Sequence, residues 1–280
     1  MKIRKIATII EPQPVLEGAG VRLKRSIATR TLNYLDPFLL LDHFGSKKPE
    51  DYEAGFPMHP HRGIETVTYI LSGSVHHRDT LQNSGSIGAG DIQWMTSGRG
   101  IMHEEMPQVS PEGVDGFQLW VNLPAKSKMT APRYQDVRSG QIPATRRPDG
   151  SLVRVIAGTV DEVQGAVRDI AADPIYMDVT VPPESEFVFP VTAGHNAFAY
   201  VFEGEGLFGD EQARVGHPRL VIFEDGDLMK ARTRKEPVRF LLVSGKPLHE
   251  PVARYGPFVM NTKEEIEQAL EDLRRGTFVR

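Results

Sequence analysis

The sequence predicts an all-β protein. Short runs rich in Val, Ile, Phe, Tyr and Thr, such as ETVTYILSG, FQLWVNL, IYMDVTV and VRFLLVSG, recur along its 280 residues. Most of the 26 glycines and 21 prolines fall between these runs, where turns are needed. Runs of this kind at a spacing of about 8–12 residues indicate a β-sandwich or a β-barrel.

A weak internal repeat indicates that the strands form two domains of similar architecture. The stretch TVTYILSGSV in the first half aligns with AFAYVFEGEG in the second, so that Tyr69 falls on Tyr200 and Gly73 on Gly204. Both halves continue in the same order, with a strand, a glycine turn, a strand, a Gly-Asp turn and a strand. A repeat in sequence predicts a repeated structural unit.

The boundary between the two domains is predicted at the stretch DVRSGQIPATRRPDG, which is polar, basic and rich in Gly and Pro. We therefore expect a first domain over residues 1–135, a linker over residues 136–150 and a second domain over residues 151–280.

One segment, at about residues 262–275, is typical of an α-helix. Thr262 can cap its N-terminus, and Glu265 would complete a capping box three residues later. Gly276 stands where a helix commonly stops. The apolar stripe of this helix consists of Ile266, Ala269, Leu270 and Leu273. We expect the helix to end the second domain and to dock on a sheet.

Composition excludes several classes of protein. The net charge of −4 and the lack of a long basic block speak against direct nucleic-acid binding. No apolar run reaches the length of about 18 residues that a membrane-spanning helix needs. The apolar run at residues 6–10 is too short for the core of a signal peptide, so we expect a cytoplasmic protein. There are no cysteines, so any metal must be held by nitrogen and oxygen ligands.

Two short motifs together predict a metal site. His59 and His61 in FPMHPHRGIE are two residues apart, so on a strand their side chains point to the same face, roughly 6–7 Å apart. His103 and Glu105 in GIMHEEMP have the same spacing. If the two segments pair, they offer three nitrogens and one oxygen to a single ion. Zinc accepts such a set in tetrahedral form, and redox metals use it with open coordination positions.

Glu65 is an alternative carboxylate for this site. It shares strand parity with His59 and His61, but a straight strand would place it about 13 Å from His61. It could reach the ion only if the chain turns at Gly63. We therefore rank Glu105 as the carboxylate ligand, and Glu65 as an outer-shell group or alternate base.

The second half lacks these ligand types. The internal repeat places Pro190 and Thr192 at the positions of His59 and His61. We therefore expect the second domain to keep the scaffold without the metal.

Residues near the two motifs in sequence are candidates for substrate binding. Phe56, Met58 and Met102 could form an apolar mouth, although core packing is the more usual fate of such side chains. Arg62 could orient an anionic substrate, or it could simply pair with an acidic neighbour.

The stretches FPMHPHRGIETVTYILSGSVHHRD, GDIQWMTSGRGIMHEEMP and GFQLWVNLP resemble the pirin family of bicupins. The resemblance implies two cupin-type β-barrel (jelly-roll) domains face to face, with a metal in the N-terminal domain only. That metal is usually iron, while Mn, Ni, Co, Cu and Zn stay open on ligand chemistry. Carried over by position, the pirin ligands fall on His59, His61, His103 and Glu105.

Two functions follow from this resemblance. Some pirins resemble quercetin 2,3-dioxygenases, which implies a flavonol-like small molecule and dioxygen as substrates. Glu105, or Glu65, would then take the proton of the flavonol hydroxyl. The alternative is a redox-sensitive iron-binding regulator that binds a protein partner, a transcription factor or a metabolic enzyme. Both functions use the same four ligands, so the sequence does not separate them.

Overall fold

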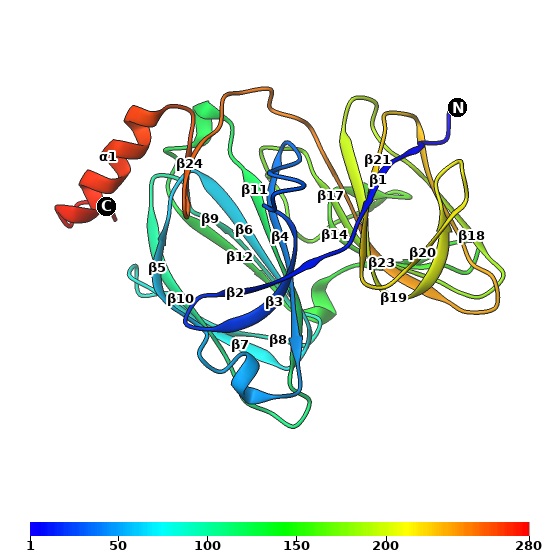
Figure 1. The fold of residues 1–280 in the computed structure, drawn as a ribbon, viewed down its shortest axis with the longest axis horizontal. Coiled ribbons are helices and arrows are strands. Elements are labelled where there is room, and N and C mark those ends of the chain that lie inside the picture. Colours follow the sequence, from blue (N-terminus) through cyan, green and yellow to red (C-terminus); the bar gives the residue numbers. More distant parts are fainter. Residues whose placement is uncertain (280) are drawn as a thin grey trace. The chain divides into compact units, whose positions relative to one another are not determined.

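The structure, a computed structural model, describes residues 1–279 and divides into two compact units (Figure 1). The N-terminal unit consists of residues 13–139 and the segment that starts at Leu248. The C-terminal unit consists of Met1–Pro12 and Gly140–Pro247. The chain thus passes from one unit to the other inside the segment that the sequence predicts as a linker. Each unit also takes one end of the chain from the other half of the sequence.

The N-terminal unit contains a seven-stranded and a four-stranded antiparallel sheet. The larger sheet has the order β12 (Arg133–Val137), β9 (Ile92–Thr96), β6 (Ile64–Ser72), β11 (Val114–Asn122), β4 (Phe38–Ser46), β3 (Val21–Ile27) and β2 (Gln13–Glu17). The smaller sheet has the order β5 (Phe56–His61), β10 (Ile101–Pro107), β7 (Ser74–Asp79) and β8 (Ser84–Gly88). Short 3-10 helices at Pro49–Asp51, Ala125–Ser127 and Ser139–Gln141 complete the connections.

Apolar side chains from both sheets meet inside this unit. Leu23 and Phe44 of the larger sheet pack in one cluster with Val75 and Ile87 of the smaller sheet. β7 and the first half of β3 bury alternate residues, because successive side chains of a strand point to opposite faces. The interior between the two sheets is therefore reached by every second residue of β5 and β10.

The C-terminal segment adds a hairpin and a helix to the N-terminal unit. The hairpin consists of β24 (Ala253–Tyr255) and β25 (Phe258–Met260), and α1 (Lys263–Arg274) follows it. The predicted capping box is present: Thr262 Oγ1 accepts from the backbone N–H of Glu265, whose side chain accepts from the backbone of Thr262. In the part of the chain that the structure describes, no helix is long and apolar enough to cross a membrane.

The C-terminal unit is built around a ten-stranded sheet. Its main path is β1 (Ile6–Ile10), β21 (Arg219–Phe223), β19 (Asn196–Phe208), β23 (Val238–Gly245), β17 (Ile175–Val181), β14 (Leu152–Ala157) and β13 (Ala144–Arg146). Off this path lie β18 (Glu186–Pro190), β20 (Ala213–Gly216) and β22 (Leu228–Arg232), and β15 (Thr159–Val160) pairs with β16 (Val163–Gln164). Its core is apolar and includes Phe187, Phe189, Phe208 and Phe240.

The internal repeat of the sequence corresponds to a repeat in structure. Tyr69 of β6 and Tyr200 of β19 are both fully buried. Gly73 and Gly204 follow them with positive φ angles of 74° and 69°. At each glycine a Cβ atom would lie 2.1 Å from a backbone carbonyl oxygen, so both turns exclude any larger residue. The two-domain, all-β prediction is therefore confirmed, although the sheets do not close into complete barrels.

Candidate metal centre

Three histidines converge where β5 and β10 pair. The register of these antiparallel strands places His103 opposite His59 and Ile101 opposite His61. Along β10 the buried residues alternate with half-buried ones, so His103 and Glu105 point inward while Glu104 points outward. Glu104 pairs there with Arg78 of β7, as the opposite parity requires.

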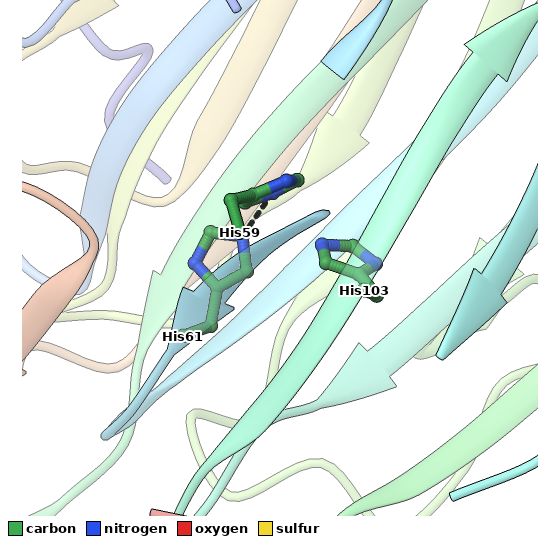
Figure 2. A group of neighbouring side chains, drawn as sticks. All are labelled: His59, His61 and His103. Carbon is green, nitrogen blue, oxygen red and sulfur yellow. Dashed lines mark hydrogen bonds between the residues drawn. The ribbon is translucent and has the colours of Figure 1, made fainter. Parts of the chain in front are cut away.

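The three rings form one compact group (Figure 2). The ring centroids of His59 and His103 lie 4.5 Å apart, those of His59 and His61 4.8 Å, and those of His61 and His103 5.1 Å. One candidate ligand nitrogen from each ring lies within 4.8 Å of the others. The Nε2 atoms of His59 and His61 are only 3.0 Å apart. Three imidazole nitrogens at this separation can bind one ion in common.

The hydrogen bonds around the cluster fit a bound cation. His59 Nδ1 faces the carbonyl oxygen of Pro57 at 3.0 Å, so Nδ1 carries the hydrogen and the lone pair lies on Nε2, toward the cluster. His103 is buried, and among residues 1–279 neither of its ring nitrogens has a hydrogen-bond partner. A buried polar atom without a partner is costly, and a metal ion at this position would remove that cost.

Burial also favours the protonation state that metals require. Desolvation lowers the pKa of His61 and of His103 well below the ordinary value, and nearby histidines lower it further. The pKa of His59 is lowered too, again chiefly by desolvation. Neutral imidazole is the form that ligates metals. The three rings can therefore bind a metal ion without first releasing an imidazolium proton.

Glu105 lies in the same interior, two residues after His103. It is buried, and its Oε1 accepts a hydrogen bond of 3.0 Å from Thr68 Oγ1 of β6. Burial raises the pKa of Glu105 to about 7. The compact group of ligand atoms comprises the three histidines, and Glu105 is not a member of it. Its role as the fourth ligand therefore stays a prediction.

Glu65 is directed away from this interior. The turn at Gly63, where φ is 80°, separates β5 from β6, so the parity of His61 does not continue into β6. Within β6, Glu65 has the opposite parity to Thr68, which contacts Glu105, and it therefore faces the other side of the sheet. There it accepts a hydrogen bond of 2.8 Å from Thr96 Oγ1.

A cavity of about 550 Å³ opens beside the histidines, and we call it the histidine cavity. It is lined by Glu17, Gly18, Val21, Leu23, Arg25, Leu40, Asp42, Phe44, Phe56, Pro57, His59, His61, Thr68, Val75, Glu105, Pro107, Gln118, Trp120, Arg254, Gly256 and Pro257. The ring of Trp120 meets that of His61 edge to face, with centroids 5.0 Å apart, and the Arg254 guanidinium lies 5.1 Å from the Trp120 ring. The volume lies within the range of small-molecule sites.

Of the four predicted substrate contacts, the structure brings Phe56 to the cavity and places the others elsewhere. Arg62 is buried, forms an ion pair of 2.7 Å with Asp272 of α1 and lies 4.4 Å from the centroid of the Phe278 ring. Met102 packs in the apolar cluster of the C-terminal segment. The side chain of Met58 is exposed and does not line the cavity.

One wall of the histidine cavity is polar, and the sequence does not predict it. Asp42 and Gln118 are adjacent in register on β4 and β11, and Thr68 and Arg25 lie next to them on β6 and β3. Strand pairing brings these residues together from four separate strands. The alternation of Gln118 and Trp120 with apolar neighbours was the one signal that could have pointed to them, once the buried face was known.

Comparisons with known proteins identify the family. The pirin family profile matches residues 20–121, and the profile of the pirin C-terminal cupin domain matches residues 176–279. Together the two matches cover more than half of the chain. The chain belongs to the pirin family. The resemblance seen in the sequence is thereby confirmed, and with it the two cupin-type domains.

Similar proteins span nearly the whole chain. A Pseudomonas aeruginosa protein named "Putative quercetin 2,3-dioxygenase" is 43% identical, with 98% of each chain covered. Human pirin is 41% identical over 97% of this chain and 92% of its own. Among solved structures, a quercetin 2,3-dioxygenase from Acinetobacter baumannii has a TM-score of 0.88 and 35% identity, covering 99% of this chain and 98% of its own.

Proposed function

We propose that this pirin binds one transition metal ion in its N-terminal unit and uses it to cleave flavonols such as quercetin with dioxygen. The convergence of His59, His61 and His103 beside the histidine cavity, which the first two of them line, carries the proposal. The resemblance to proteins named as quercetin 2,3-dioxygenases supports the choice of reaction. The flavonol dioxygenase and the iron-binding regulator both require a mononuclear metal.

The proposed ligands are His59, His61 and His103, with Glu105 as the fourth. The three histidines are already grouped, and Glu105 lines the same cavity. Nitrogen and oxygen donors of this kind suit Fe, Mn, Co, Ni, Cu and Zn, and we expect iron. The apolar interior of the C-terminal unit, with its cluster of phenylalanines, offers no comparable set among the described residues.

A bound metal and the side chains that line the cavity would have different roles in the reaction. A bound metal would supply an open coordination position for the ionised flavonol hydroxyl and a route for electrons to dioxygen. Trp120 and Phe56 both line the cavity and would provide aromatic contacts to the flat rings of the substrate. The flavonol ring would open with loss of carbon monoxide.

Glu105 is the proposed base that takes the proton of the flavonol hydroxyl. It lines the cavity beside the histidines, and Thr68 holds its Oε1. Glu65 is bonded to Thr96 on the opposite face of the sheet, so we do not give it this role. A base must come within hydrogen-bond reach of the proton that it takes, and of these two carboxylates only Glu105 lines the cavity.

The proposal predicts metal-dependent loss of the visible absorbance of quercetin. Protein stripped of metal would be reconstituted separately with Fe, Mn, Co and Ni and mixed with quercetin in air-saturated buffer. We expect turnover with at least one metal and none without metal, and the His103→Ala variant should be inactive with all of them. Absence of turnover with every metal, in protein shown to contain it, would exclude the flavonol dioxygenase.

The regulatory alternative uses the same ligands and stays a prediction. A protein that holds iron, lacks flavonol turnover and binds a protein partner only in one iron oxidation state would support it in place of the enzyme. A pull-down with Fe(II)-loaded and Fe(III)-loaded protein, with the His59→Ala variant as control, distinguishes the two.

A further inference from the structure

One wall of the histidine cavity carries a row of polar side chains that begins beside the proposed metal. The row crosses four neighbouring strands at one register level: Thr68 on β6, Gln118 on β11, Asp42 on β4 and Arg25 on β3. Thr68 stands at the metal end, because its hydroxyl contacts Glu105. Two strand spacings separate Thr68 from Asp42, which is about 10 Å. All four residues line the cavity.

Apolar side chains flank this polar row on both sides. At the next register level on one side lie Trp120 and Leu40, which pair with each other across β11 and β4. On the other side Phe44 pairs with Leu23 across β4 and β3. These four residues also line the cavity. The wall therefore has the pattern that a flat aromatic ligand with polar groups along its length would match.

Asp42 is the fixed acceptor in this row. The residue is 4% exposed, and its carboxylate receives two hydrogen bonds from Arg25, of 2.8 Å from Nε and 2.7 Å from Nη2. Arg25 is held in turn by Glu17, at 2.6 Å. Each carboxylate oxygen has a second lone pair, so Asp42 can accept a further hydrogen bond from a group in the cavity. The bidentate pair fixes the direction of that bond.

Gln118 adds a donor between Asp42 and the metal end. Its Oε1 lies 2.6 Å from Thr68 Oγ1, so Thr68 shares its one hydroxyl hydrogen between this oxygen and Glu105 Oε1, and the amide hydrogens of Gln118 are left for a ligand oxygen. From the metal outward, the row thus presents a hydroxyl, an amide donor and a carboxylate acceptor. A buried carboxylate rejects a ligand that cannot donate to it, because its own hydrogen-bonding capacity would be left unused.

We propose that Asp42, held by Arg25, determines specificity by accepting a hydrogen bond from a ring hydroxyl of the bound flavonol, at the end of the cavity away from the metal. This inference rests on the proposed function, and it narrows the substrate class. A flavonol is rigid and planar, and the rings on either side of the one that bears the 3-hydroxyl can carry further hydroxyls. Flavonols with such a hydroxyl are the preferred substrates, and 3-hydroxyflavone, which lacks them, is a poor one.

The test compares two substrates on two variants of the metal-loaded, full-length protein. For wild type we expect kcat/KM for quercetin to exceed that for 3-hydroxyflavone by about 10-fold or more, the value of one hydrogen bond to a charged group. Asp42→Asn should remove most of this preference through a higher KM for quercetin, while kcat/KM for 3-hydroxyflavone stays near the wild-type value.

Asp178→Asn is the matched control. Asp178 of β17 is a buried carboxylate that takes the same two hydrogen bonds from Arg239, which also bonds Glu203, but it does not line the histidine cavity. This variant should keep the wild-type preference. A preference retained in Asp42→Asn, or absent from active wild type, would overturn the specificity role alone. Turnover of neither flavonol by metal-loaded wild type would instead count against the proposed function. Binding of both flavonols, followed by tryptophan fluorescence, would then still test Asp42 by the same ratio.

Discussion

Replacing His61 by alanine should abolish tight metal binding and flavonol turnover. His61 is 1% exposed, its Nε2 lies 3.0 Å from that of His59, and it contacts His103 and Trp120. Loss of an outer-shell partner alone typically costs about 10–100-fold in metal affinity or activity, so loss of a ligand should cost at least 100-fold. Elemental analysis after dialysis measures the metal content, and quercetin absorbance measures the activity.

His76→Ala provides the control for this experiment. His76 lies on β7 of the same sheet, and its parity places it on the outer face, where it contacts Ser86. It should retain full metal content and activity. Full metal retention by His61→Ala would mean that the ligand set is incorrect, because no rearrangement of two remaining histidines should restore the original affinity.

Replacing Lys128 by methionine should strongly destabilise the N-terminal unit. Lys128 is 1% exposed, and its ammonium donates to the carbonyl oxygens of Gly63 and Val259 and to Asn122 Oδ1, at 2.8–3.0 Å. It joins the turn after His61 to β11 and to the C-terminal hairpin. Methionine fills similar space but leaves three buried acceptors without this donor, at an expected cost of about 3 kcal/mol. Urea unfolding of the metal-free protein measures the change.

The matched control for this variant is Lys126→Met, two residues away. Lys126 lies in the 3-10 helix Ala125–Ser127, and its side chain is exposed, so its loss should change the free energy of unfolding by less than about 0.5 kcal/mol. Equal stability of the two variants would show that the Lys128 contacts contribute little. Because Gly63 lies only two residues after His61, we also expect Lys128→Met to weaken metal binding.

Strand alternation made much of the metal centre predictable. His59 and His61, and likewise His103 and Glu105, are two residues apart, and each pair shares one face of a strand in the structure. The shared site also requires β5 to pair with β10, and the register shows that they do pair. The capping box of α1 could also be predicted, because Thr262 and Glu265 lie within one helical turn of each other.

Residues whose partners are distant in sequence could not be placed in this way. Counted along the sequence, Glu65 has the same strand parity as His61. The chain turns at Gly63, which has a positive φ, and a new strand begins after it. Arg62 is held by Asp272, which comes 210 residues later, so nothing near Arg62 could reveal that its charge is already paired. The packing of the C-terminal segment in the N-terminal unit is likewise a contact between parts of the chain that are distant in sequence.

The polar row is the clearest example of a feature that could not be predicted from the sequence. Arg25, Asp42, Thr68 and Gln118 are unremarkable as separate residues, and each lies in a different strand. Only the register of four strands shows that they form one wall of the cavity beside the histidines. Register depends on the pairing of all the strands in the sheet, so it cannot be inferred from the strands considered one at a time.

The central claim is that one metal ion is bound by the three histidines of the N-terminal unit. Anomalous diffraction at the absorption edge of the loaded metal, from crystals of the reconstituted protein, tests this claim most directly. We predict a single strong anomalous peak among the rings of His59, His61 and His103, and none in the C-terminal unit. A strong peak elsewhere, or no peak at these rings in protein with one equivalent of bound metal, would contradict the account.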